Sequence, residues 1–188
     1  MAFENHQPRL VKYTQFYGMN VHQVWAAATP SLAPTLLSCL RLPGGWWEVQ
    51  MELLSTNDGW LRLDKAPQHR PAAVQALRRA HQLLVGQHNY GVHGDVRDVN
   101  VFVRLVHGGN VDVRFVDFDW AGLSGVVRYP SFMNHAGVNW PAGALDGQPI
   151  LPQHDVQLLS NAMQQRLLPY AWQHDVCAWE CWSYAMHV

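Results

Sequence analysis

Three polar residues at fixed spacing around a β-rich segment constrain this chain more than any other feature. The run HGDVRDVN spans residues 93–100 and carries Asp95 and, five positions later, Asn100. Asp117 follows two apolar runs and opens the triplet Asp117-Phe118-Asp119. Each residue alone has an ordinary explanation, because Asp and Asn are common in turns and at strand ends. As a spaced set, they predict that two carboxylates and one amide converge around a common cation.

The segment between these residues is predicted to be a β-hairpin. Residues 99–106 and 111–116 are rich in β-branched residues, and His107-Gly108-Gly109-Asn110 separates them. In the second run, apolar and polar residues alternate with the period of a strand. Asp117 is therefore expected at the end of a strand, on a scaffold rigid enough to hold a metal ligand.

Periodicity and turn signals predict the remaining elements. We expect helices over 15–28, over 71–87 and from about 154 onward, strands over 36–42 and 46–54, a long ordered loop over 118–153, and an amphipathic segment from about 171 to the end. Residues 55–69 are polar and interrupted by Gly and Pro, which is typical of a boundary. This predicts a small N-terminal part, residues 1–54, and a larger part, residues 55–188.

The spaced set suits phosphoryl transfer, which requires charge neutralisation, in-line positioning and a group that accepts the proton of the attacking hydroxyl. Asp95 is the candidate base. Asn100 would hold a magnesium ion through its amide oxygen, and Asp117 would bridge the metal to the phosphates, since hard cations prefer oxygen ligands. Arg97 could lay its guanidinium against the transferring phosphate.

With these residues in place, the chain resembles the protein-kinase-like superfamily, in particular the kinase-like proteins of the fungal type and, more distantly, the aminoglycoside and choline kinases. HGDVRDVN is similar to the catalytic loop of these proteins, and Asp117-Phe118-Asp119 to the metal-binding triplet, with Asp in the Gly position. Val11-Lys12-Tyr13 looks like the strand that carries the nucleotide-binding Lys, and residues 50–54 (QMELL) resemble the hinge.

The resemblance implies an α+β fold with a reduced N-terminal β-lobe and a mostly helical C-terminal lobe that contains the catalytic-loop hairpin. It also implies ATP and Mg²⁺ as cofactors and a protein or small-molecule hydroxyl as acceptor. Lys12 would contact the phosphates, and Glu52 and Leu53 would contact adenine through their backbone. Asp155 looks like the helix Asp that braces the catalytic loop, and Gly125–Pro130 with Asn139–Pro141 looks like an activation segment.

Several departures from the family pattern leave three interpretations open. Only eleven residues precede Lys12, and they contain no glycine, so the Gly-rich loop is missing from this sequence. Asn20 stands near the place of the helix Glu that pairs with the Lys, Gly94 replaces the Arg of the catalytic loop, and 33 residues follow Asp155. The alternatives are an active phosphotransferase, a pseudokinase that serves as a binding module, and an incomplete gene product with an exposed sheet edge.

Composition excludes several other classes. Thirteen basic and fourteen acidic residues nearly balance, which speaks against a partner such as nucleic acid or anionic lipid. No apolar run approaches the ~20 residues that span a bilayer, and three cysteines fit a reduced, intracellular and cytoplasmic setting. A zinc site at His174, Cys177, Cys181 and His187 is disfavoured by its spacing, and we expect an amphipathic packing helix there.

Overall fold

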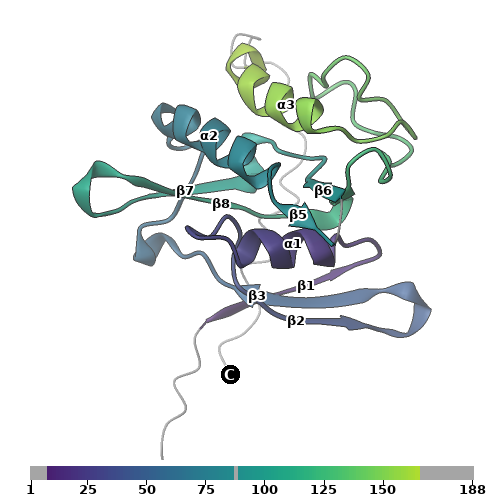
Figure 1. Cartoon of the computed structure of the whole chain (residues 1–188), viewed down its shortest axis with the longest axis horizontal. Coiled ribbons are helices and arrows are strands. Elements are labelled where there is room, and N and C mark those ends of the chain that lie inside the picture. The colour runs from purple at the N-terminus through teal and green to yellow at the C-terminus, as the bar shows by residue number, and fades with distance from the viewer. Residues whose placement is uncertain (1–7, 87–88, 166–188) are drawn as a thin grey trace, which may run out of the picture.

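The computed structural model describes residues 8–86 and 89–165, with side chains described as far as residue 160. Its architecture is a mixture of helices and small antiparallel sheets (Figure 1). An N-terminal sheet forms one side of the molecule, and α1 lies directly over it. The β7–β8 hairpin, α2 and α3 follow in turn on the other side of α1 (Figure 1).

The N-terminal sheet contains β1 (Arg9–Thr14), β2 (Leu36–Arg41) and β3 (Trp47–Glu52) in the order β1-β3-β2. Both pairings are antiparallel, and Val49 of β3 lies opposite Lys12 on one side and opposite Cys39 on the other. The turn between β2 and β3 passes through Pro43–Gly45, where Gly44 adopts a positive φ of 77°. The two strands predicted around this turn are therefore confirmed, each slightly shorter than expected.

Helix α1 (Met19–Ala26) is shorter than the predicted helix over residues 15–28. Residues 15–18 are not helical, because the backbone of Gly18 packs directly against Ala121 and its N–H donates to the carbonyl of Phe118 at 2.8 Å. The helix ends before Thr29-Pro30, as the prolines predict. One face of α1 is buried, with Val21, His22 and Trp25 inside.

A second sheet contains β4 (Leu61–Arg62), β7 (Val101–Leu105) and β8 (Val111–Phe115) in the order β4-β7-β8. The predicted hairpin is confirmed: β7 and β8 pair antiparallel, with Val103 opposite Val113, and a 3₁₀ turn at His107–Gly109 joins them.

Helix α2 (Arg70–Ala80) ends seven residues earlier than the predicted 71–87. Leu84–Val85 forms the short strand β5 instead, which pairs with β6 (Asn89–Val92). Strand β6 in turn pairs with β9 (Gly122–Leu123). Pairing within this short hairpin, and of β6 with the distant β9, overrides the helical periodicity that predicted a longer α2.

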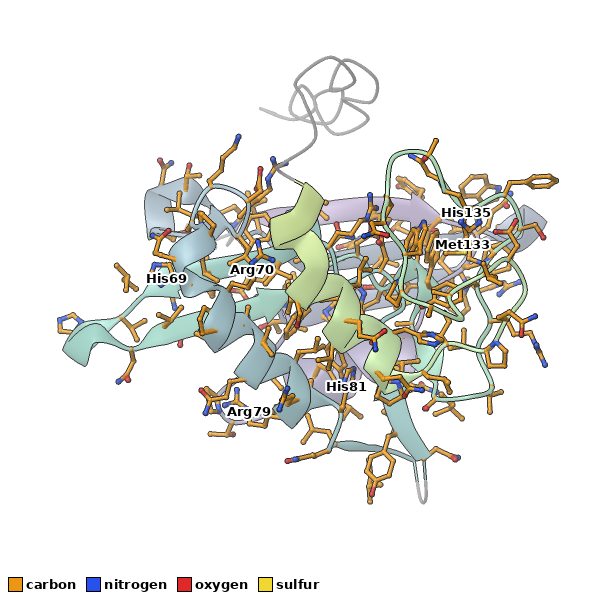
Figure 2. All side chains as sticks on the ribbon, turned by 90° about the horizontal axis from the view of Figure 1, so that it is seen from above. His69, Arg70, Arg79, His81, Met133 and His135 are labelled. Carbon is orange, nitrogen blue, oxygen red and sulfur yellow. The ribbon has the colours of Figure 1, made fainter. Side chains whose placement is uncertain are left out.

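The predicted loop over 118–153 contains the short strand β9 and then runs without a longer element to α3 (Pro152–Gln165), which begins close to its predicted start. Viewed from above, α3 runs alongside α2, which begins at Arg70 and is followed by His81 (Figure 2). The predicted segment from 171 onward, including the four disfavoured zinc ligands, lies outside the described residues.

The main core lies where α1, α2 and the β7–β8 hairpin meet, and Trp25, Leu77, Phe115 and Phe118 are completely buried in it. Burying each such side chain stabilises a fold by roughly 1.5–3 kcal/mol. Phe115 and Phe118 flank Asp117, so the residue that follows β8 is anchored on both sides. No helix among the described residues is long and apolar enough to cross a membrane.

Candidate phosphoryl-transfer site

The segment His93–Asn100 follows β6 and is fixed from behind by Asp155 of α3. The Asp155 carboxylate is completely buried and accepts hydrogen bonds from the backbone N–H groups of His93 and Gly94, both at 2.8 Å. It also lies 3.0 Å from Nε2 of His81 on α2. Because this carboxylate is 61 residues beyond Gly94 in the chain, it holds the loop through tertiary structure alone.

The imidazole of His93 connects this loop to the end of β8. Its Nε2 lies 3.0 Å from the carbonyl oxygen of Val116, and its ring packs 5.0 Å from that of Phe118. The loop that carries Asp95 and the triplet that begins at Asp117 are therefore held side by side.

Asp95 is 6% exposed and fully engaged within its own loop. Arg97 approaches it with two nitrogens, Nε at 2.5 Å from Oδ1 and Nη2 at 2.7 Å from Oδ2. Asn100 donates its amide Nδ2 to the Asp95 backbone oxygen at 3.0 Å and to Oδ2 at 2.9 Å. This leaves the amide oxygen of Asn100 as the atom that could bind a metal, and no described residue donates to it.

Arg97, predicted to contact the transferring phosphate, points to Asp95 in this structure. Burial alone would lower the pKa of its guanidinium, but the hydrogen bonds and charge of Asp95 outweigh burial, and Asp117 adds to them, so that the pKa is raised. The charge of Asp117 thus acts on Arg97, although the hydrogen bonds of this guanidinium go to Asp95.

A buried ion pair that the sequence analysis did not anticipate supports the same loop. Arg70, at the start of α2, binds the carboxylate of Asp98 at 2.6 and 2.5 Å and the carbonyl oxygen of Leu159 at 2.7 Å. Arg70 is 6% exposed, and Figure 2 shows it where α2 meets α3. The one signal in the sequence was a second Asp within HGDVRDVN, which has no role in the metal chemistry.

A cluster around Lys12 forms the other half of the site. The Lys12 amine lies 2.5 Å from Oδ1 of Asp117 and 2.8 Å from Oδ1 of Asp119, although 105 residues separate Lys12 from Asp117. Thr14, two residues further along β1, donates its hydroxyl to Oδ2 of Asp119 at 3.0 Å. Lys12, predicted to contact phosphates, thus lies in direct contact with two carboxylates of the triplet, an arrangement that the sequence analysis did not predict.

The electrostatics of this cluster are unbalanced, with one positive charge facing two negative ones. Burial opposes the charged Lys12 amine, but Asp117 and Asp119 outweigh it and raise the pKa of Lys12. Burial and repulsion from Asp117 raise the pKa of Asp119 in spite of Lys12 and Thr14. A further cation at this position would lower the energy of both carboxylates.

The backbone at Asp117 is strained, with φ at 71° in the left-handed region that favours glycine. Such a conformation costs of order 1–3 kcal/mol and persists where the surroundings impose it. Here the buried Phe115 and Phe118 on either side impose it, and the Asp117 carboxylate is aimed at Lys12.

The chemistry of these donors suits a magnesium ion with bound phosphates. Mg²⁺ in nucleotide sites takes one or two protein oxygens and completes its shell with phosphates and water. Asp117 and the amide oxygen of Asn100 provide that number. Among the described residues, no group of three His, Cys, Asp or Glu side chains forms an all-protein metal site.

Glu52 and Leu53, predicted to form the hinge, lie at the end of β3 and directly after it, next to the start of β1. The N–H of Glu52 donates to the carbonyl of Thr35 at 2.9 Å, and that of Leu53 donates to Pro8 at a longer 3.4 Å. The adenine contact through this backbone stays a prediction, and the N–H of Leu53 is the more weakly held of the two.

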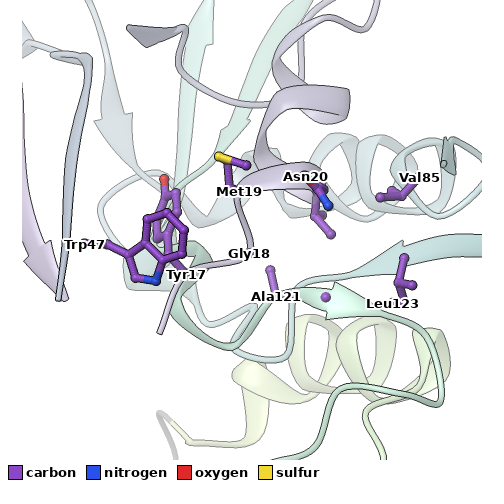
Figure 3. A pocket seen from close by; sticks show the side chains of 10 residues that line it. Tyr17, Gly18, Met19, Asn20, Trp47, Val85, Ala121 and Leu123 are labelled. Carbon is purple, nitrogen blue, oxygen red and sulfur yellow. The ribbon is translucent and has the colours of Figure 1, made fainter. Parts of the chain in front are cut away.

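Asn20 does not take the place of the missing helix Glu. Together with Tyr17, Met19 and Trp47 it lines a pocket of about 320 Å³ between α1, β3 and β9 (Figure 3). No hydrogen bond among the described residues joins Asn20 to Lys12. The partner of the Lys12 amine comes from the triplet and not from α1.

No protein family model matches the sequence, and no curated protein matches it. Among solved structures, the chain is similar to the kinase PK-1 of Cydia pomonella granulovirus, with 16% sequence identity and a TM-score of 0.55. The match covers 85% of this chain and 61% of the viral kinase, so the chain spans less than two thirds of that protein. At this identity the likeness concerns the fold alone, which is kinase-like.

Proposed function

We propose that this protein is an ATP- and Mg²⁺-dependent phosphotransferase that transfers the γ-phosphate to a protein or small-molecule hydroxyl. The observation that carries the proposal is the contact of Lys12 with Asp117 across 105 residues, beside a loop in which Asp95 and Asn100 are held together. The proposed lysine, base and two oxygen ligands belong to two clusters, and His93 connects their backbones through Val116 and Phe118.

Each residue has a distinct role in this proposal. Lys12 binds phosphate oxygens as a compact positive charge, and Asp95 orients the acceptor hydroxyl and receives its proton. Asp117 and Asn100 would hold the magnesium, which neutralises charge on the phosphates during transfer. The charge of Asp117 acts on Arg97, and in this proposal the guanidinium stabilises the transferring group once nucleotide is bound. The adenine contact falls to the backbone of Glu52 and Leu53.

The proposal also divides the chain into two parts. Residues 1–54 would be a partial N-terminal lobe with the Lys strand, α1, the β2–β3 hairpin and the hinge. Residues 55–188 would be the C-terminal lobe with the catalytic loop and metal-binding segment. The sheet order β1-β3-β2, in which the Lys strand pairs with the strand that leads into the hinge, supports this division.

One observation favours the alternative of a pseudokinase that binds partners without turnover. Arg97 occupies both carboxylate oxygens of Asp95, and Asn100 adds a hydrogen bond to one of them. These contacts cover the two oxygens that an acceptor hydroxyl would have to reach. Catalysis requires Arg97 to release Asp95, whereas the function of a pseudokinase does not require this release.

Thermal denaturation with and without ATP·Mg²⁺ tests nucleotide binding. Ligand at about 100 times Kd stabilises a fold by about 2.7 kcal/mol, which gives a clear rise in Tm. We expect this rise in the wild type and in Asp95→Ala, and its loss in Asp117→Ala. Asp58→Ala, in an exposed turn far from the triplet in sequence, is the matched control and should keep the rise. A wild type that shows no rise at millimolar ATP·Mg²⁺ contradicts the proposal.

Transfer of labelled γ-phosphate to the protein or to a panel of hydroxyl compounds then separates the two candidate functions. A phosphotransferase incorporates label, and Asp95→Asn reduces the rate by about 10²–10⁴. Nucleotide binding without incorporation, equal in wild type and Asp95→Asn, supports the pseudokinase.

A further inference from the structure

The residue that precedes α1 has no room for a side chain. A Cβ placed on Gly18 would lie 2.4 Å from the carbonyl oxygen of Ala121, closer than any real contact. The first turn of α1 contains no acidic residue. His22, one turn later, is stacked on Phe118 with ring centroids 4.5 Å apart and is not available either. The backbone at the start of the helix therefore contacts the triplet through Gly18 and Phe118, and the first turn contains no carboxylate that could pair with Lys12.

Asp119 stands where the triplet of the resembled family has glycine, and its carboxylate is directed at Lys12. Its Oδ1 lies 2.8 Å from the amine, in a contact that lacks the alignment of a hydrogen bond. Its Oδ2 accepts the hydroxyl hydrogen bond of Thr14, which is 8% exposed. Thr14 and Lys12 lie on the same strand and face the same way, so β1 presents both partners to Asp119 together.

The two carboxylates around Lys12 differ in what else they do. Asp117 is the candidate metal ligand, so its oxygens would be shared with the cation once nucleotide is bound. Asp119 has no such second task and is tied to β1 through Thr14. It can keep its contact with the amine whether or not a metal is present.

We infer that Asp119 is the positioning residue of Lys12 and replaces the carboxylate that α1 cannot supply. This inference rests on the proposed function for its purpose, which is to aim the amine at the phosphates. The ion pair itself can be tested without nucleotide. The triplet has aspartate in the glycine position, and the first turn of α1 has no acidic residue. In this inference the first feature compensates for the second.

Selective acylation of the free protein tests the ion pair directly. The chain contains only two lysines, so mass spectrometry can follow Lys12 with the exposed Lys65 as an internal reference. With acetic anhydride, we expect Asp119→Asn to raise the acetylation rate of Lys12 relative to Lys65 severalfold, because the amine loses a partner that shields it. Asp119→Glu, which keeps the carboxylate, should stay near the wild type, and Asp58→Asn should change nothing. An unchanged rate in Asp119→Asn overturns the inference.

Nucleotide affinity tests the purpose of the pair. We expect Asp119→Asn to weaken ATP binding about tenfold, with and without Mg²⁺, and to leave adenosine binding unchanged, while Asp119→Glu recovers most of the affinity. A loss that occurs only with Mg²⁺ would make Asp119 a metal ligand, and an equal loss for adenosine would make it purely structural; either overturns the inference. Should Asp119→Asn fail to fold, Thr14→Val removes only the hydroxyl and should give a smaller loss of the same kind. A wild type that binds no ATP contradicts the proposed function, yet the acylation result still decides whether the ion pair exists.

Discussion

The two halves of the candidate site are built differently. On the catalytic-loop side, His93, Asn100 and Asp155 are at most 1% exposed, and their polar groups bond to each other or to backbone. On the lysine side, the side chains of Lys12 and Asp117 are each 20% exposed, and two carboxylates compete for one amine. The first half is held together by buried hydrogen bonds, although the amide oxygen of Asn100 receives none from a described residue. The second has an excess of negative charge that a cation would relieve.

This difference indicates that the first half of the site stabilises the fold and that the second half is suited to binding a ligand. Buried polar networks with every partner in place are rigid, and removing one member leaves the others unsatisfied. Partly exposed ion pairs near water contribute little to stability, because solvent screens them. Substitutions on the loop side should therefore act on folding, and substitutions on the lysine side should act on binding.

The largest expected effect on folding is that of Asp155→Ala. It removes the acceptor of two backbone N–H groups and a partner of His81 in a fully buried place. We expect the free energy of unfolding to fall by about 3–5 kcal/mol, as measured by urea denaturation. Ser160→Ala, on an exposed position of the same helix, is the control and should change it by less than about 0.5 kcal/mol. An equal effect of the two substitutions would contradict the distinction between the two halves.

The second prediction concerns the loss of stability as the pH falls. His22 is completely buried, with Tyr17 at 2.5 Å from Nδ1 and the carbonyl of Pro34 at 2.8 Å from Nε2. Burial lowers the pKa of His22 to about 4. The hydrogen bond to Pro34 opposes this shift, and the charge of His93 adds a little to it. The unfolded chain, with an ordinary His pKa near 6.5, takes up this proton first as the pH falls.

Stability from His22 is therefore present above pH ~6.5 and is lost as the pH falls toward 4, by up to about 3 kcal/mol. Urea denaturation at several pH values measures it. His22→Gln, which cannot take up the proton, should show a smaller loss over this range. His107→Gln, on the exposed hairpin turn, should behave like the wild type. Identical pH dependence in all three proteins would refute a neutral buried His22.

The elements that sequence reasoning predicted well are those with local signals. The hairpin over β7 and β8 has alternating residues and a glycine turn, and the β2–β3 hairpin has Pro43-Gly44-Gly45. The contact of Lys12 with Asp117 was not predicted, because a separation of 105 residues leaves no trace in the local sequence pattern.

What could not be predicted depends on contacts between distant segments. Residues 81–86 have helical periodicity, but Leu84–Val85 forms a short hairpin with β6, and β6 is held in turn by the distant β9, where Gly91 lies opposite Leu123. The Arg70–Asp98 pair joins α2 to the catalytic loop in the same way. The contact of Asp119 with Lys12 could not be predicted either, because it joins β1 to a triplet 105 residues further along the chain.

The smallest effect we predict compares two glycines with nearly the same backbone conformation. Gly94 in the catalytic loop has φ of 86°, and Gly109 in the hairpin turn has φ of 77°. A Cβ on Gly94 would meet Ile150 at 2.8 Å and Trp120 at 3.0 Å, whereas a Cβ on Gly109 would meet nothing within 4 Å. The positive φ costs both alanine variants about 1 kcal/mol, and close packing adds to it at Gly94 alone.

We therefore expect Gly94→Ala to lower the free energy of unfolding by about 2–3 kcal/mol and Gly109→Ala by about 1 kcal/mol. Urea denaturation of both variants under the same conditions measures the difference. Gly94 stands where the resembled family has the arginine of its catalytic loop, and the same packing that makes alanine costly here leaves no room for that longer side chain. Equal losses in the two variants would mean that the loop can move away from Ile150 and Trp120. The catalytic-loop side of the site would then be less rigid than its buried hydrogen bonds indicate.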